Sequence, residues 1–232
     1  MTKKLILYVK LLFAFCFLVQ LTFCAKYKEK LKDVASVSVI NAVVDGTTVC
    51  LGGNPNGVAN YSLSKLVLLA GDYELYVWPY PDSTHPYCSK YWFTADVEST
   101  YSLFVGGAKS NPACLLVKDS LPLISDSAFG VRFINLSPNS PPLNITLSTA
   151  PTLPEVSNLG YFTNPTRFKQ YPAKSTNASY TFQFRKTSDN TVVASYSFST
   201  IPRFANVTLA LAGMIGGSGT QAIRVIRLTN DR

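Results

Sequence analysis

Alternation of apolar and polar residues with a period of two dominates the chain after residue 33. The clearest run places Tyr180, Phe182 and Phe184 between polar neighbours. Such alternation is typical of half-buried β-strands, because successive side chains of a strand point to opposite faces. Glycine, proline, asparagine and aspartate pairs separate the runs and predict tight turns. Shorter runs of the same kind occupy residues 37–39, 73–77, 207–211 and 223–225.

Helical periodicity is weak in the same region. Residues 60–69 carry the best apolar stripe with helical spacing, and we expect at most one or two helical turns there. Many short strands separated by turn signals instead predict an all-β sandwich or barrel. The composition agrees, because 47% of residues are hydrophobic, 12% are aromatic and only 15% are charged. Disordered chains and coiled coils have a different composition, and aromatic residues favour strands.

The two halves of the chain align with each other in four segments that keep the same order. Each half has about the size of an immunoglobulin-like domain, roughly 100 residues. We therefore expect two tandem antiparallel β-sandwiches, over residues 34–118 and 129–232, joined by a linker over residues 119–128. The matched segments are 37–42 with 131–136, 71–77 with 178–184, 91–94 with 196–199, and 102–107 with 208–213, the last followed by 115–117 with 223–225.

The N-terminus carries the signals of export. Residues 1–4 include two lysines, and an uninterrupted apolar run covers residues 11–19 before a polar, lysine-rich segment. This order predicts a secretory signal peptide over residues 1–24 and a tether over residues 25–33. Polar residues bound the apolar run, which is shorter than the ~20 residues that a transmembrane helix needs.

The end of this segment, Leu21-Thr22-Phe23-Cys24, resembles a bacterial lipobox, whose cysteine is lipidated and becomes the mature N-terminus. We therefore expect lipidation of Cys24 and a protein anchored in the cell envelope, facing the outer membrane or the periplasm. A lipid and several nearby lysines suit an anionic membrane surface. Two alternatives stay open: a cleaved signal peptide in which Cys24 is incidental, and an uncleaved anchor.

Residues 131–147 form a predicted strand, an Asn-x-Ser-Pro turn and a second predicted strand. This segment resembles the opening of the family catalogued as domain of unknown function 4397. Residues 37–49 are similar but lack the Ser-Pro pair, and residues 69–73 and 171–180 resemble the family's approach to an aromatic strand. The resemblance implies exported, often lipid-anchored envelope proteins with immunoglobulin-like or prealbumin-like sandwiches. It brings no established activity and no catalytic residues.

The positive charge is concentrated at the N-terminus. The whole chain has a formal net charge of +8, but seven of its lysines lie before residue 33. From residue 33 onward, 14 lysines and arginines face 12 aspartates and glutamates. A nucleic-acid-binding surface needs basic residues clustered on the folded part. We therefore expect no nucleic-acid partner.

Three cysteines, Cys50, Cys88 and Cys114, follow the N-terminal segment. An exported chain allows one disulfide and one free thiol, and the sequence leaves the pairing open. His85 and Cys88 have a spacing seen in zinc sites, which Cys50 and Cys114 would have to complete. Small buried cysteines are the commoner reason for such residues. We expect no metal and no cofactor.

Signals of catalysis are absent or incomplete in the sequence. His85 is the only histidine and lies in a proline-rich segment three residues after Asp82. No Gly-x-Ser-x-Gly elbow occurs, and residues 216–220 fit a hairpin turn better. The acidic residues are scattered beside turn signals, where they cap turns. We therefore expect no enzyme, with an envelope hydrolase as the weaker alternative.

One aromatic segment stands out. Residues 78–92 contain both tryptophans of the chain, whereas the second half has a polar hairpin over residues 186–191 at the same place. Loops on rigid sandwiches often carry binding sites, and aromatic side chains offer large contact faces. The predicted ligand-binding residues are Trp78, Tyr80, His85, Tyr87, Tyr91 and Trp92.

The aromatic segment could also have a purely structural role. Trp78 and Trp92 could face the core while the loop packs against the second domain, or a disulfide could staple the loop without any partner. The favoured function is a non-catalytic envelope module for binding or adhesion, contacting a glycan or a protein. A structural spacer is the alternative. The pattern specifies no oligomeric state.

Overall fold

The computed structural model describes residues 33–52, 54–173 and 179–230. Its described part is all-β, as predicted, with one short 3₁₀ helix, η1, at Gly219–Gln221. The strands are β1 Val34–Asn41, β2 Val49–Leu51, β3 Asn54–Val58, β4 Ser62–Leu69, β5 Gly71–Pro79, β6 Cys88–Ala95, β7 Thr100–Ala108, β8 Asn111–Lys118, β9 Ala128–Asn135, β10 Leu143–Leu147, β11 Ala150–Leu159, β12 Lys169–Pro172, β13 Thr181–Lys186, β14 Val192–Ser197, β15 Asn206–Ala212 and β16 Arg224–Asn230.

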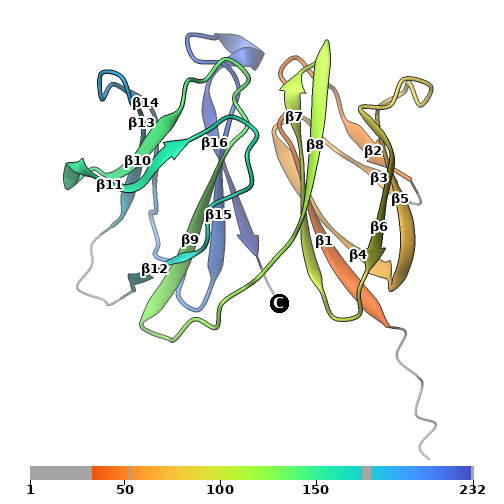
Figure 1. Ribbon diagram of the computed structural model, residues 1–232, viewed down its shortest axis with the longest axis horizontal. Coiled ribbons are helices and arrows are strands. Elements are labelled where there is room, and N and C mark those ends of the chain that lie inside the picture. The colour runs from red at the N-terminus through yellow and green to blue at the C-terminus, as the bar shows by residue number, and fades with distance from the viewer. Residues whose placement is uncertain (1–32, 53, 174–178, 231–232) are drawn as a thin grey trace, which may run out of the picture. The chain divides into compact units, whose positions relative to one another are not determined.

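The strands form four sheets of four strands each. The first sandwich pairs the sheet β4-β1-β7-β8 with the sheet β3-β2-β5-β6, and the second pairs β12-β9-β15-β16 with β11-β10-β13-β14 (Figure 1). Each strand of the first sandwich has its counterpart eight strands later, so the predicted tandem architecture is confirmed. The arrangement is not purely antiparallel, because β1 runs parallel to β7 and β9 runs parallel to β15.

The strand register repeats residue by residue. Val37 pairs with Tyr101 in the first sandwich, and Val131 pairs with Val207 in the second. Gly107 and Gly213 hold the same position and have φ values of 88° and 87°. A Cβ atom would lie 2.5 Å from a backbone oxygen at Gly107 and 2.4 Å from one at Gly213. Only glycine fits this turn, so the repeat preserves a backbone requirement.

The last segment of the sequence alignment is wrong by three residues. Phe104 pairs with Leu115, and its counterpart Ala210 pairs with Ile226, so Leu115 matches Ile226 and not Ile223. The connection from β15 to β16 includes η1, whereas β7 and β8 meet in a tight hairpin. The longer connection between β15 and β16 displaces the sequence match of the last strand by three residues.

The helical turns expected within residues 60–69 are also wrong. Residues Ser62–Leu69 form strand β4, which pairs antiparallel with β1 at a sheet edge. Leu66 and Leu68 pack against the core of the first sandwich, while Leu63 packs against a different core. A strand with apolar contacts on both faces loses simple alternation, which explains the misleading pattern.

Three hydrophobic cores stabilise the described unit. The cores inside the two sandwiches collect inward-facing residues of both sheets, and the second core is markedly aromatic. Leading members of the first core are Val37, Val39, Leu75, Val77, Leu103 and Val105. Leading members of the second are Phe129, Phe133, Phe182, Phe184, Phe198 and Leu209.

The third core lies between the sandwiches. It joins the outer face of sheet β4-β1-β7-β8 to the outer face of sheet β12-β9-β15-β16. Ile40 and Phe104 contribute from the first, and Ile134, Ala210 and Leu228 from the second, all fully buried. Burying these side chains makes residues 33–232 one compact unit.

A buried polar network borders this third core. Arg132 of β9 forms an ion pair with Asp119 at 2.8 Å, and their side chains are only 4% and 0% exposed. Arg132 also donates to Thr208 Oγ1 at 2.8 Å and to Ser102 Oγ at 3.0 Å. Asn230 donates to Ser102 Oγ and Asp119 Oδ2. The network links the first sandwich, the start of the connecting segment and the second sandwich.

The predicted linker differs in the structure. The predicted linker 119–128 is not a free spacer, because Asp119 and Leu121 are buried and Ala128 opens strand β9. The signal peptide and the lipidation site Cys24 lie outside the described residues, as does nearly all of the tether. Within the described ranges, no helix has the length and apolar character needed to cross a membrane.

Candidate functional site

The two ends of the predicted aromatic loop belong to two paired strands. Trp78 lies near the end of β5, and Tyr91 and Trp92 lie in β6. Only residues 80–87 form the connecting loop. The prolines of this segment suggested a longer loop, but Pro79 still pairs with a residue of β2 at the end of its strand. The strands therefore give the aromatic side chains fixed positions.

Strand alternation separates the core side chains of β5 from its outward ones. Val77 is buried in the first core, so its neighbours Tyr76 and Trp78 lie on the opposite, outer face of the sheet. Trp92 pairs with Glu74 and shares that outer face. The rings of Tyr76 and Trp78 have centroids 5.5 Å apart, and Trp92 is 68% exposed. We call Tyr76, Trp78 and Trp92 the aromatic face.

The alternative that both tryptophans face the core is therefore wrong. Trp92 is largely solvent-exposed, and Trp78 is half-buried on the outer side of the sheet. The packing against the second domain comes from elsewhere, since the third core is built on the other sheet of the first sandwich.

The second sandwich is polar at the equivalent positions, which are Gln183, Arg185 and Ser197. Arg185 donates to Gln183 Oε1 at 2.6 Å and to Thr146 Oγ1 at 3.1 Å. The hydroxyls of Thr181 and Ser197 are 2.7 Å apart. The same scaffold thus carries a hydrogen-bonded polar surface in the second sandwich and aromatic rings in the first, of which Trp92 is exposed and Tyr76 and Trp78 are half-buried.

Two carboxylates lie on the outer face beside the rings. Asp72 Oδ1 accepts a hydrogen bond from Thr94 Oγ1 at 2.6 Å, and Glu74 Oε1 accepts one from the Lys90 backbone N–H at 2.8 Å. Lys90 has φ 60° at a bulge of β6, which turns its N–H toward β5. The second oxygen of each carboxylate has no hydrogen-bond partner within the described ranges. The face therefore combines rings with fixed acceptors.

The loop over residues 80–87 is tied to this face. Tyr76 donates its hydroxyl to the Ser83 carbonyl at 2.7 Å. Asp82 Oδ1 accepts hydrogen bonds from the Thr84 hydroxyl and backbone N–H, and Asp82 Oδ2 lies 2.8 Å from His85 Nδ1. The Thr84 bonds, with His85 contributing, lower the pKa of Asp82 to about 2. His85, a predicted ligand-binding residue, is exposed in this loop.

The remaining predicted ligand-binding residues divide between the surface and the interior. Tyr80, directly after β5, and Tyr91 of β6, opposite Leu75, are exposed. Tyr87 instead packs against the first core, and burial raises the pKa of its phenol. Its buried hydroxyl has no hydrogen-bond partner in the described part of the chain. The structure therefore leaves Tyr87 only partly exposed, and its side chain supports the loop from the core side.

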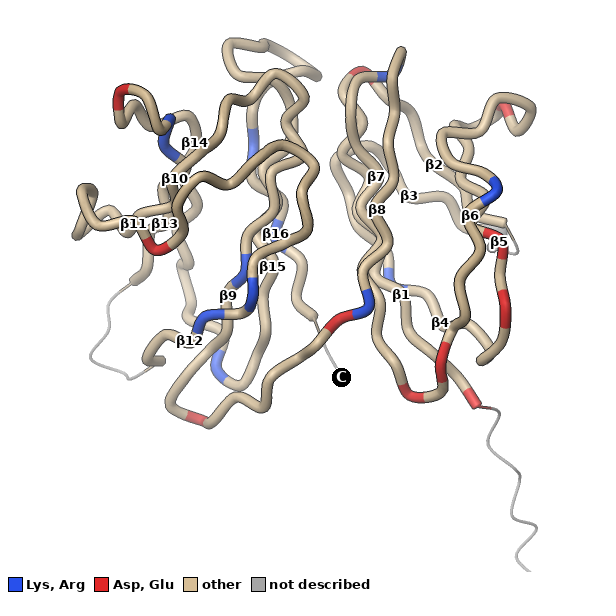
Figure 2. Tube along the Cα trace, in the orientation of Figure 1, with Lys and Arg blue, Asp and Glu red and all other residues tan. Residues whose placement is uncertain are grey.

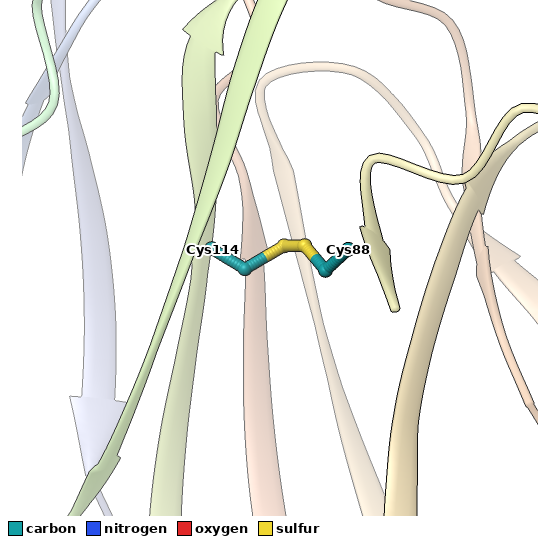
Figure 3. The surroundings of a disulfide bond; sticks show 2 residues. All are labelled: Cys88 and Cys114. Atoms are coloured by element: carbon teal, nitrogen blue, oxygen red, sulfur yellow. A yellow bond between two sulfur atoms is a disulfide. The ribbon is translucent and has the colours of Figure 1, made fainter. Parts of the chain in front are cut away.

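A disulfide joins Cys88 of β6 to Cys114 of β8, with Cα atoms 6.1 Å apart (Figure 3). It connects the edge strands of the two sheets of the first sandwich. Ala194 and Val225 hold the equivalent positions in the second sandwich and pack against its core. Cys50 is buried and free.

This pairing removes the zinc alternative, because the sulfur atoms of Cys88 and Cys114 are bonded to each other. Within residues 33–52, 54–173 and 179–230, no group of three or more histidine, cysteine, aspartate and glutamate side chains is arranged to hold a metal ion.

A second candidate site, missed by sequence reasoning, is a groove of about 720 Å³ beside the connecting segment. Its cationic lining residues are Lys118, Arg132 and Arg167, which come from distant parts of the chain. Lys118 is paired with Asp96 at 2.7 Å, and Arg132 is paired within the buried network. Because two of its three cations are already neutralised, the groove is a weaker ligand site than the aromatic face.

Comparison with known proteins finds no family model that matches the chain and no curated protein that matches it. The resemblance to the domain of unknown function 4397 therefore stays a prediction from the sequence.

Proposed function

We propose that this protein is a non-catalytic recognition module of the cell envelope, and that the aromatic face of its first sandwich is the binding surface for a glycan or a protein. One observation carries the proposal: aromatic side chains stand where the equivalent sheet of the second sandwich has hydrogen-bonded polar ones. The two sheets have the same strand order and equivalent strand pairs. The fold alone therefore does not explain why one sheet carries aromatic side chains and the other polar ones.

Exposure and rigidity support the same proposal. A tryptophan that is 68% exposed leaves a large apolar surface in water, which is recovered when a ligand covers it. The rings lie on paired strands, and the Tyr76 hydroxyl ties the adjacent loop in place. A preorganised surface loses little conformational entropy on binding.

The non-catalytic part of the proposal rests on the partners of the titratable groups. His85 and Asp82 bond to each other and to Thr84 in one exposed turn, an arrangement that stabilises the loop itself. Asp72 and Glu74 each accept a hydrogen bond from the neighbouring strand. These contacts give each group a structural role.

A structural spacer is the second candidate. The third core and the buried ion pair of Arg132 with Asp119 make the two sandwiches one unit, as a spacer would need. In both cases we propose export and attachment to the membrane through Cys24, which the N-terminal pattern favours.

The test is a binding screen of residues 33–232, which contain all three cores, against polysaccharides and envelope extracts. Trp92→Ser introduces the side chain that stands at the equivalent position of the second sandwich. Phe204→Asn is the matched control, because Phe204 is 64% exposed outside the aromatic face and has φ 59°, which asparagine tolerates.

We expect a ligand that the natural chain and the control variant bind and that the folded Trp92→Ser variant binds at least about tenfold more weakly. Circular dichroism and thermal unfolding check the fold of each variant. Equal binding by all three, or binding by none, would reject the aromatic face as a recognition surface and leave the spacer as the better candidate.

A further inference from the structure

We propose that the ligand of the aromatic face is a neutral polysaccharide. This inference rests on the proposed function and adds the chemical class of the ligand. It follows from the combination of flat rings, fixed carboxylate acceptors and the charge of the first sandwich.

The rings supply a stacking surface for sugar units. The apolar C–H face of a pyranose ring packs on an aromatic side chain as other flat apolar groups do. Tyr76 and Trp78 lie two residues apart on β5, and Trp92 lies on the same face of β6, opposite Glu74. Neighbouring strands lie about 4.8 Å apart. Rings carried by two such strands can therefore contact successive sugar units of one polysaccharide. A polymer therefore uses this surface better than a single sugar.

The carboxylates distinguish a sugar from an ordinary protein partner. Asp72 and Glu74 each have one oxygen bonded to the neighbouring strand and a second oxygen without a described partner. The buried centre of a protein interface is depleted of charged residues, because covering an unpaired carboxylate with apolar groups is costly. Sugar hydroxyls donate hydrogen bonds to such oxygens and at the same time leave the ring faces free to stack.

Charge excludes acidic polysaccharides from this face. Residues 34–118 contain four lysines and no arginine against six aspartates and glutamates, two of which are Asp72 and Glu74. Figure 2 shows the acidic residues of β5, which are Asp72 and Glu74, whereas β6 carries one lysine, Lys90. Residues 129–232 instead contain ten lysines and arginines against three aspartates and glutamates. A carboxylated or sulfated polymer is therefore repelled by the first sandwich, and a neutral polymer is not.

Intrinsic fluorescence is the direct probe, because both tryptophans of the chain belong to the aromatic face. Residues 33–232 are titrated with cellohexaose, maltohexaose, chitohexaose and laminarihexaose. Hexagalacturonate represents an acidic glycan, and a trilysine peptide represents a cationic partner. We expect at least one neutral hexasaccharide to change the emission with saturation.

Two variants and one change of salt define the expected result. Trp92→Ser should weaken binding of that hexasaccharide on the order of tenfold or more, measured by calorimetry, and Phe204→Asn should leave it unchanged. The affinity should change by less than about twofold between low and high salt, since stacking and neutral hydrogen bonds are little screened.

The outcomes separate this inference from the proposed function. If only the trilysine peptide, hexagalacturonate or an envelope protein binds and Trp92→Ser abolishes that binding, the aromatic face is a recognition surface and the neutral glycan is wrong. If a neutral hexasaccharide binds the natural chain and Trp92→Ser equally well, it binds at another surface, and the inference about the aromatic face is wrong. If nothing binds in a manner that depends on Trp92, both proposals fall.

Discussion

A single buried guanidinium fixes the junction of the two sandwiches. Burial lowers the pKa of Arg132, and the neighbouring Asp119 carboxylate opposes that shift. Ser38 holds the equivalent position in the first sandwich, so the repeat itself does not require a cation here. Arg132 therefore serves the junction between the two halves and not the repeated scaffold.

Asp119→Ala should destabilise the protein by about 3–5 kcal/mol, because it leaves the Arg132 guanidinium buried without its counter-ion. Urea unfolding followed by circular dichroism measures the loss. The double variant Arg132→Ser/Asp119→Ala, which installs the residue of the first sandwich, should lose less than the single one. A loss below about 1 kcal/mol for Asp119→Ala would contradict the assigned role.

Protonation of Asp82 should weaken the hydrogen bonds of the loop over residues 80–87, but only in strong acid. The pKa of Asp82 is lowered from 3.8 to about 2 by the Thr84 and His85 hydrogen bonds. A lowered pKa means that the stabilising contribution is fully present above pH 4 and is lost as the pH falls through 2. The NMR shifts of the Asp82 carboxyl carbon and the Thr84 amide should show this midpoint. A midpoint near 4 would show that these bonds are not formed in solution.

At the scale of the strands, the sequence predicts elements well where apolar and polar residues alternate clearly. The alternation around Tyr180, Phe182 and Phe184 predicts β13, and Phe182 and Phe184 lie in the second core. It fails for β4, because both faces of that strand make apolar contacts. The prediction is partly wrong for residues 78–92. The prolines there indicate a loop, but both ends of the segment belong to the paired strands β5 and β6.

The candidate site was predictable only in outline for the same reason. The contrast between aromatic and polar segments is visible in sequence, and it locates Trp78 and Trp92. The pairing of Trp92 with Glu74 lies next to a bulge of β6 at Lys90, which no local pattern signals. Tyr87 looks like its exposed neighbours in sequence, yet it packs against the core.

The disulfide should stabilise the first sandwich at its open edge. The variant Cys88→Ala/Cys114→Val installs the pair that stands at the same positions in the second sandwich. Loss of a cross-link between residues 26 positions apart should lower the free energy of unfolding by about 3 kcal/mol. Chemical denaturation of the two forms without reductant measures the difference.

Adding a reductant supplies the control for that variant. Reductant should destabilise the natural chain by a similar amount and leave the variant unchanged. Cys50, which is buried in both, should react with a thiol reagent only after unfolding. Equal stability of the two forms would mean that the disulfide has no stabilising role.

At the scale of the whole molecule, the third core decides how the repeats behave. The pattern of residues around Ile40 and Phe104 predicts strands, and it gives no signal that their outer faces meet those of β9 and β15. Contacts between repeats arise from residues far apart in the chain, which periodicity does not detect. The sequence therefore predicts two sandwiches and misses that they pack into one compact unit.

Phe104→Ala should destabilise both sandwiches together, by about 3–5 kcal/mol, because it opens a cavity in the third core. Calorimetry of residues 33–232 should show one unfolding transition before and after the substitution, shifted to lower temperature. Phe204→Asn, which changes an exposed aromatic residue, should leave the transition in place. Two separate transitions in the natural chain would contradict a shared core.

The position of β1 has a mechanical consequence. The described chain enters this strand at its first residues, and β1 is hydrogen-bonded on both sides, antiparallel to β4 and parallel to β7. A pull applied through the N-terminal segment against a ligand held elsewhere acts along the strand axis. The bonds to both neighbours then bear the load together in shear, instead of opening one after another. If the protein is tethered through its N-terminal segment, a pulling force on the tether reaches β1 first. The first sandwich would therefore resist unfolding at the strand where the force enters.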